Sequence, residues 1–133
     1  MIHLRPAESD DDKFYMFTLR IDPVASRMSR RRAPTWEEHC HWWERTTDRL
    51  YVAMLDDARV GTLRLSSDGV VSIIVDPAYR GMGYGPAMLK ALEPLAATDG
   101  FTTLLAEVAY ENVRSQQCFI KAAWMPVLFE VHL

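Results

Sequence analysis

The stretch from residue 70 to residue 92 constrains the fold more than any other part of the 133-residue chain. Val70 to Val75 is the most strongly β-branched run and predicts a strand. Three glycines then occur within five residues, and apolar side chains follow at helical spacing. The segment therefore predicts a strand that passes through a glycine-rich turn into a helix, a context in which such turns bind ligands.

The turn itself reads Arg80-Gly81-Met82-Gly83-Tyr84-Gly85-Pro86. Glycines permit positive φ and close approach, so successive N–H groups can point together at phosphate oxygens near a helix N-terminus. A Walker loop is excluded because no Gly-Lys-Ser or Gly-Lys-Thr is present, and a dinucleotide fingerprint needs glycine where Pro86 stands. The turn predicts a diphosphate site of another kind, with Arg80 adding a cationic side chain; a plain turn is the alternative.

Periodicity and turn residues divide the rest of the chain into further elements. A capping box from Thr35 to Glu38 predicts a helix start, and Asp56-Asp57 suits a hairpin turn. Strands are expected at about 2–5, 50–55, 59–65, 70–75, 102–108 and 124–131, and helices at about 10–21, 35–47, from the glycines to 99, and 112–122. The order β-α-α-β-β-β-α-β-α-β predicts a single α/β domain over residues 1–133, with a mixed, mostly antiparallel sheet flanked by helices.

The sequence predicts further details of the first helix, of the loop after it and of the helix after the glycines. Phe14, Phe17 and Ile21 recur at helical spacing and indicate the first helix, and residues 22–34 are expected to form an irregular loop. Pro94 is expected to bend or shorten the helix after the glycines. That helix is expected to carry one apolar face: Met88, Ala91, Leu92 and Leu95.

Composition excludes several function classes. The 15 basic and 18 acidic side chains give a net charge of -3 without concentration at either end, which argues against nucleic-acid binding despite the Arg30-Arg31-Arg32 run. No apolar run approaches the roughly 20 residues of a membrane span, so we expect a cytoplasmic protein that binds no membrane. Cys40 and Cys118 are far apart without metal-ligand spacing, so free, buried thiols and no metal are expected.

Residues 50 to 125 resemble the GNAT superfamily of N-acetyltransferases. Arg80, Gly83 and Gly85 fill its pattern of Arg or Gln, two residues, Gly, one residue, and Gly or Ala. The segment from Val71 to Pro77 is similar to the strand and Asp-Pro loop that precede this pattern. The residues similar to the superfamily's C-terminal ending are Glu111, Asn112, Ser115, Phe119, Lys121, Ala123 and Trp124.

The resemblance implies acetyl-coenzyme A (acetyl-CoA) as acyl donor. Its pyrophosphate would lie on the N–H groups of residues 81–85 and its pantetheine arm alongside residues 70–75, with free backbone groups of Ile74 and Val75 orienting the thioester. Asn112 and Ser115 would touch the cofactor, unless they serve only as cap and first turn of their helix. The implied cofactor-binding residues are Ile73, Ile74, Val75, Arg80, Gly81, Met82, Gly83, Tyr84, Gly85, Asn112, Ser115 and Phe119.

The sequence departs from the superfamily pattern at three places. Pro86 removes an N–H group, Ala123-Trp124 replaces Gly-Phe, and Phe119 stands where many members have a tyrosine general acid. The proton for the departing thiolate must therefore come from elsewhere or from water. Transfer to an amine also needs a base. Glu107, acting through water, and Tyr110 are the catalytic candidates. His39 and His41 are less favoured candidates.

Residues 19–43 carry the features that indicate the class of the acceptor. Arg20-Ile21-Asp22-Pro23 and His39-Cys40-His41-Trp42 resemble the Arg-Asn-Asp-Pro and His-x-x-Trp of the branch that acetylates nucleotide-linked aminosugars. The resemblance implies a small-molecule amine bound by Arg20, His39 and Trp42; the tryptophans either stack on the substrate or anchor their helix. Acetylation of a protein N-terminus and a non-catalytic coenzyme A or nucleotide sensor are the alternatives. A monomer or homodimer is expected.

Overall fold

The computed structural model describes residues 1–25, 32–107 and 112–125. A short helical stretch begins at Pro23, where an irregular loop was expected. It forms because Asp22 Oδ2 accepts a hydrogen bond from the Ala25 N–H (3.0 Å), and proline suits a first helical position. The other elements, in chain order, are β1 (Ile2–Pro6), α1 (Asp10–Arg20), α3 (Trp36–Arg45), β2 (Arg49–Leu55), β3 (Ala58–Leu65), β4 (Val71–Val75), the 3₁₀ turn η1 (Pro77–Tyr79), α4 (Tyr84–Thr98) and α5 (Val113–Lys121).

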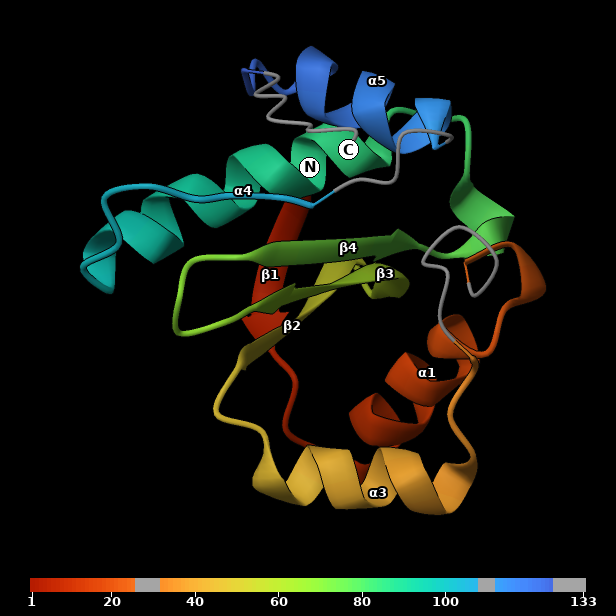
Figure 1. Ribbon diagram of the computed structural model, residues 1–133. Helices are drawn as coiled ribbons and strands as arrows, with labels where there is room; N and C mark the ends of the chain where they lie inside the picture. The colour runs from red at the N-terminus through yellow and green to blue at the C-terminus, as the bar shows by residue number, and fades with distance from the viewer. Residues whose placement is uncertain (26–31, 108–111, 126–133) are drawn as a thin grey trace, which may run out of the picture.

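Among the described residues, four strands form one antiparallel sheet in the order β1-β2-β3-β4. The expected meander of β2, β3 and β4 is confirmed, with Asp56 in a left-handed conformation in the hairpin turn (φ 53°). β1 pairs with β2 and completes the sheet. Figure 1 shows α4 and α5 on one side of the sheet and α1 and α3 on the other. The expected α/β class with helices flanking the sheet is therefore confirmed.

The main core lies between the sheet and α4. The expected inward face of α4 is only partly right: Leu95 is exposed, while Leu89 and Ala96 are buried. Pro94 is exposed and does not shorten the helix, which continues to Thr98. The buried α4 residues are Gly85, Met88, Leu89, Leu92 and Ala96, a repeat of three and four residues that keeps one stripe against the sheet.

The buried face of α1 differs from the row of apolar residues at helical spacing. Asp12, Met16 and Leu19 are buried, whereas Phe14 and Ile21 are exposed. Asp12 can be buried because both its oxygens accept hydrogen bonds from Arg5 of β1 (2.7 and 2.8 Å). These bonds outweigh the effect of burial and hold the pKa of Asp12 well below its usual range.

Helix starts differ in how they satisfy their first N–H groups. The capping box predicted for α3 is confirmed, and α1 has another at Ser9 and Asp12. α5 begins at Asn112, whose Oδ1 accepts a hydrogen bond from the Ser115 N–H (3.2 Å). α4 begins after Gly83, which makes no side-chain cap. The first turn of α4 therefore keeps N–H groups that no side chain satisfies.

The strand expected at 102–108 is replaced, over its described part, by one isolated parallel bridge. Leu105 accepts a hydrogen bond from the Val71 N–H (2.7 Å) and donates one to the Gly69 carbonyl (2.8 Å). Pairing does not continue along β4, so residues 102–107 form no strand. Val108 and most of the strand expected at 124–131 lie outside the described residues. Cys40 and Cys118 are free but only partly buried. In the described ranges, no helix combines the length and apolarity that crossing a membrane requires.

Candidate functional site

The glycine loop comprises residues 80–85, and its residues 81–83 are exposed to solvent. Gly81 and Gly83 both have φ of 80°, a left-handed conformation that favours glycine. Nothing lies within 4 Å of the position that a Cβ atom would take at either residue. Met82 between them is 60% exposed. The loop is therefore neither filled nor covered by side chains of the described chain.

The backbone N–H groups of the glycine loop have no partner among the described residues. None of the amides of residues 81–85 donates a hydrogen bond to another described group. They lie at the N-terminus of α4, where the helix dipole places a partial positive charge. Pro86 adds no donor. This arrangement fits an anionic diphosphate, which accepts several N–H donors at once.

Gly85 serves a purpose that sequence reasoning missed. A Cβ atom at Gly85 would lie 2.6 Å from the Cys118 Sγ and 3.6 Å from Val75 Cγ2. The third glycine is therefore required for the close packing of α4 on α5 and β4, not for a special φ angle. The spacing of the glycines alone does not reveal this contact, because Cys118 is distant in sequence.

The Arg80 side chain has two hydrogen-bond partners within the chain. Its Nε donates to the Val75 carbonyl (3.2 Å), and its Nη2 donates to Asp22 Oδ2 (3.0 Å). Burial alone would raise the pKa of Asp22, but the hydrogen bonds from Ala25 N–H and Arg80 lower it overall. Sequence reasoning expected Arg80 to face the phosphates and did not find its partner Asp22.

A second contact joins α1 to the same end of β4. The Tyr15 hydroxyl donates to Asp76 Oδ2 (2.9 Å), and Asp76 Oδ1 accepts from the Ala78 N–H (2.9 Å). Burial and the contact with Asp76 raise the pKa of Tyr15, so the phenol stays protonated and donates. The start of the glycine loop is thus attached to α1 at two points.

The backbone of β4 alternates between its partner β3 and the open edge. Asp76 N–H donates to the Val60 carbonyl on β3, whereas Val71 N–H points the other way, to Leu105. Because antiparallel pairing alternates, the backbone groups of Ile73 and Val75 face the open edge. Ile74 is paired with Thr62, so the expectation that its backbone groups are free is corrected to Ile73. The Val75 carbonyl accepts from Arg80, which leaves its N–H as the available group.

The predicted cofactor residues on α5 have structural partners. Asn112 caps the helix through the Ser115 N–H, as the alternative interpretation expected. Phe119 is only 8% exposed and packs against Trp124, with ring centroids 4.9 Å apart. A phenyl ring suits this environment, because a tyrosine hydroxyl there would need a buried hydrogen-bond partner.

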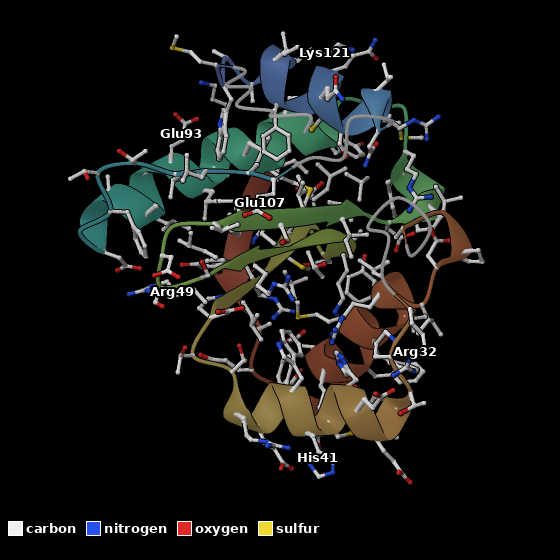
Figure 2. The ribbon with its side chains drawn as sticks, in the orientation of Figure 1. Arg32, His41, Arg49, Glu93, Glu107 and Lys121 are labelled. Atoms are coloured by element: carbon white, nitrogen blue, oxygen red, sulfur yellow. The ribbon has the colours of Figure 1, made fainter. Side chains whose placement is uncertain are left out.

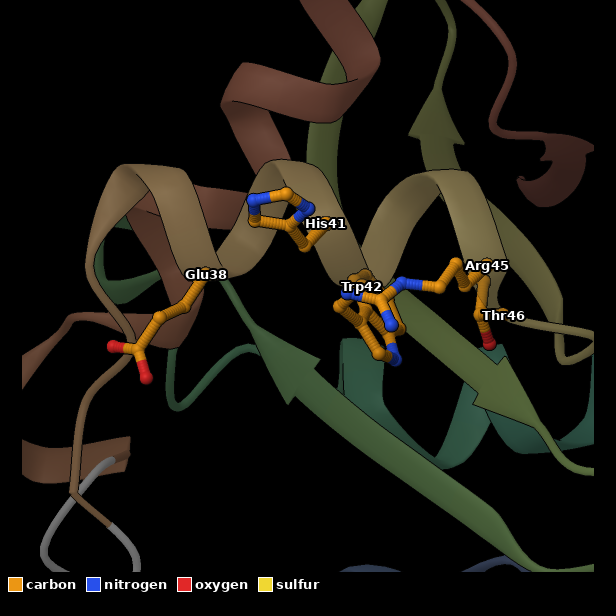
Figure 3. A pocket seen from close by; sticks show the side chains of 5 residues that line it. All are labelled: Glu38, His41, Trp42, Arg45 and Thr46. Carbon is orange, nitrogen blue, oxygen red and sulfur yellow. The ribbon is translucent and has the colours of Figure 1, made fainter.

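The catalytic candidates are dispersed. Figure 2 shows Glu107 beside β4, and its side chain is exposed. Tyr110 lies outside the described residues. His41 is exposed on α3, where it lines a shallow hollow of about 510 Å³ together with Glu38, Trp42, Arg45 and Thr46 (Figure 3). That hollow contains no residue of the glycine loop or β4. Among the described residues, no three His, Cys, Asp or Glu side chains are grouped so that they could hold a metal ion.

His39 is completely buried between α1 and α3. Its Nε2 lies 2.8 Å from the Lys13 carbonyl, and its Nδ1 lies 2.9 Å from Arg20 Nη1. A carbonyl only accepts and a guanidinium only donates, so Nε2 carries the proton and the imidazole is neutral. Burial, chiefly, lowers the pKa of His39. His39 therefore joins two helices and is not accessible to a substrate in this conformation.

The predicted acceptor residues nevertheless gather in one place. The Arg20 guanidinium carbon lies 4.5 Å from the Trp42 ring centroid, and that of Arg64 lies 5.8 Å from it. Arg64 Nη2 also donates to Ser72 Oγ on β4 (3.3 Å). Arg64 and Ser72 were missed from sequence, although the alternation of β3 together with its pairing to β4 would have placed them opposite each other.

Comparisons with known proteins agree with this geometry. Aminoglycoside acetyltransferase AAC(6')-Ib in complex with coenzyme A has a TM-score of 0.78 at 18% identity, over 92% of this chain and 83% of that chain. Spermidine N-acetyltransferase from Vibrio cholerae, in complex with CoA and spermine, has a TM-score of 0.77 at 15% identity, over 91% and 79%. A protein described as a phosphinothricin N-acetyltransferase has 0.74 at 26% identity, over 91% and 81%.

A sequence comparison with curated proteins gave no significant match. At the level of family models, however, residues 12–123 match the model of the acetyltransferase (GNAT) family. That match covers the meander, the glycine loop and α5. The chain belongs to the acetyltransferase (GNAT) family.

Proposed function

We propose that this protein transfers an acetyl group from acetyl-CoA directly to a primary amine of a small molecule. The family makes it an acyl-CoA-dependent N-acyltransferase. The observation that carries the proposal of acetyl-CoA is the row of unpartnered N–H groups at residues 81–85. Coenzyme A carries a diphosphate, and such amides at a helix N-terminus bind diphosphates.

Three parts of the chain would act in the reaction: the glycine loop, the open edge of β4 and Glu107. Acetyl-CoA supplies a thioester that a neutral amine can attack. The glycine loop would bind the diphosphate, and the outward backbone groups of Ile73 and Val75 N–H would hold the amide-containing arm against β4. Positioning of this kind accounts for much of the rate in well-oriented systems, about 7–11 kcal/mol of the barrier. Glu107 would accept the amine proton through water, and the departing coenzyme A thiolate would take its proton from water.

For the acceptor, we propose a nucleotide-linked aminosugar. Its support is the cluster of Arg20, Arg64 and Trp42, which combines two guanidiniums with one aromatic ring beside Ser72 of β4. Guanidiniums suit phosphates, and tryptophan suits a base or sugar ring. Polyamines such as the spermine bound by the Vibrio cholerae neighbour would meet two guanidiniums here against one carboxylate, that of Asp48, which lies 3.6 Å from Arg64 Nε.

The decisive experiment measures thiol release from acetyl-CoA across a panel of amines. We expect the highest kcat/KM with a nucleotide-linked aminosugar, compared with aminoglycosides, spermidine and peptides with a free N-terminus. Faster turnover of spermidine or of peptides would overturn the acceptor assignment. If acetyl-CoA binds but no amine causes thiol release, a sensor is favoured. The buried Phe119 supports this alternative, because its side chain lacks an acidic hydroxyl.

Glu107→Gln tests the proposed base. The change should lower kcat about 10²–10⁴-fold, the usual contribution of general base catalysis, and leave the Kd for acetyl-CoA unchanged. Glu93→Gln is the matched control, because Glu93 is an exposed carboxylate on α4 (Figure 2). An equal kcat in the two variants would show that Glu107 is not the base.

A further inference from the structure

Asp22 connects the end of α1 with the glycine loop through one atom. Asp22 Oδ2 accepts hydrogen bonds both from Arg80 Nη2 (3.0 Å) and from the Ala25 N–H (3.0 Å). The ion pair is well shielded, since the Arg80 and Asp22 side chains are only 21% and 16% exposed. It joins positions 58 residues apart, so it links the segment after α1 to the loop that precedes α4.

The pair changes the charge that the glycine loop presents. Arg80 directly precedes the unpartnered amides, and its positive charge would attract a diphosphate. A carboxylate 3.0 Å from the guanidinium offsets that positive charge, so less of its attraction reaches a diphosphate. With this ion pair, the glycine loop is therefore a weaker anion site than its backbone amides and Arg80 would form alone.

We propose that Asp22 lowers the affinity of the glycine loop for coenzyme A and so allows the product to leave after each turnover. The proposal rests on the proposed function, because the product carries the same diphosphate as the donor. Product release limits the rate of many enzymes. A carboxylate that partly neutralises Arg80 would keep that release fast.

Asp22→Asn isolates the charge. An amide oxygen can take the place of Oδ2 and keep both hydrogen bonds, and asparagine caps a helix as well as aspartate does. Titration calorimetry at low ionic strength should show coenzyme A bound about three- to tenfold more tightly than by the wild type, with a slower dissociation rate in stopped flow. The difference should shrink as salt is raised to about 1 M.

Asp11→Asn is the matched control. Asp11 is an exposed carboxylate in the first turn of α1, at the end of the helix away from Asp22, so the variant loses the same unit charge and should bind coenzyme A as the wild type does. Asp22→Ser, which removes the charge and keeps a capping hydroxyl, should shift the affinity in the same direction as Asp22→Asn. It provides the same test if the asparagine variant folds poorly.

A double-mutant cycle tests whether Asp22 acts through Arg80. Arg80→Gln should weaken coenzyme A binding, and adding Asp22→Asn to it should then change the Kd less than twofold. If the wild type does not bind coenzyme A, the proposed function fails. If the wild type binds and Asp22→Asn binds equally or more weakly, the inference about Asp22 is overturned and the proposed function stands.

Discussion

Two glycines with the same backbone conformation lie at opposite ends of α4. Gly83 has φ of 80° and Gly100 has φ of 93°, and neither has an atom within 4 Å of the site of a Cβ. A side chain at either position therefore costs backbone strain of about 1–2 kcal/mol but meets no clash. The two differ in that only Gly83 belongs to the glycine loop.

Gly83→Val should abolish binding of coenzyme A while leaving the fold largely intact, because the side chain disturbs the amides that would hold the diphosphate. Gly100→Val should lose a similar amount of stability and bind coenzyme A normally. Thermal unfolding and calorimetric titration of both variants check the pair. Equal affinities for coenzyme A in Gly83→Val and the wild type would remove the glycine loop from the site.

His39 makes stability depend on pH. Its pKa is lowered in the folded protein, whereas the unfolded chain binds a proton near the ordinary value of 6.5. Below that pH the unfolded state therefore gains protons that the folded state resists. The contribution of His39 is present above pH 6.5 and is lost as the pH falls toward the lowered pKa.

His39→Gln should remove this part of the pH dependence and destabilise the protein at pH 7 by about 1–3 kcal/mol, because two buried hydrogen bonds are disturbed. His41→Gln, an exposed change on the same helix, should keep the wild-type pH profile. Denaturant unfolding at several pH values between 5 and 8 provides the measurement. Identical profiles for the two variants would contradict the role of His39.

At the scale of elements, the contact between α4 and α5 depends on the absence of one methyl group. Because Gly85 has no side chain, the Cys118 sulfur can lie only 2.6 Å from the position that an alanine Cβ would take. Real Cβ atoms do not tolerate that distance, so either the Cys118 side chain or one of the two helices would have to shift. Alanine would otherwise favour the helix over glycine by about 1 kcal/mol.

Gly85→Ala should therefore destabilise the protein by about 1–3 kcal/mol, the usual cost of overpacking, in spite of the better helix propensity. Adding Cys118→Ala removes the sulfur and should recover most of the loss, which thermal unfolding of the two single variants and the double variant can measure. Strict additivity of the two changes would show that the contact is not what makes Gly85 necessary.

For the whole molecule, local signals were predictable and pairing over long distances was not. The strand, glycine loop and helix from residue 71 to residue 98 follow from β-branching, positive φ and helical spacing, and Thr35 marked the start of α3 correctly. The buried face of α1 does not follow from apolar spacing, because Asp12 can be buried only through its hydrogen bonds with Arg5 on another element. Which β4 residue faces the open edge depends on pairing with β3, so Ile74 was chosen where Ile73 is correct.

The site shows the same division between local and distant information. The glycine loop was identified from its own residues, but the ion pair of Arg80 with Asp22 joins two segments that no local pattern connects. His39, Arg20 and Trp42 were selected by resemblance and do lie together, although His39 is enclosed between two helices. Glu107 stays a prediction.

Helices α1, α3 and α4 differ in what completes their first turns. Ser9 and Thr35 complete the first turns of α1 and α3 from within the chain, but Gly83 leaves the beginning of α4 to water. A bound anion would accept hydrogen bonds from the first N–H groups of α4, as the Ser9 and Thr35 hydroxyls do at the starts of α1 and α3. Of the described helices, α4 would thus receive the hydrogen bonds of its first turn from a bound anion, and the rigidity of that turn would increase with the concentration of the anion.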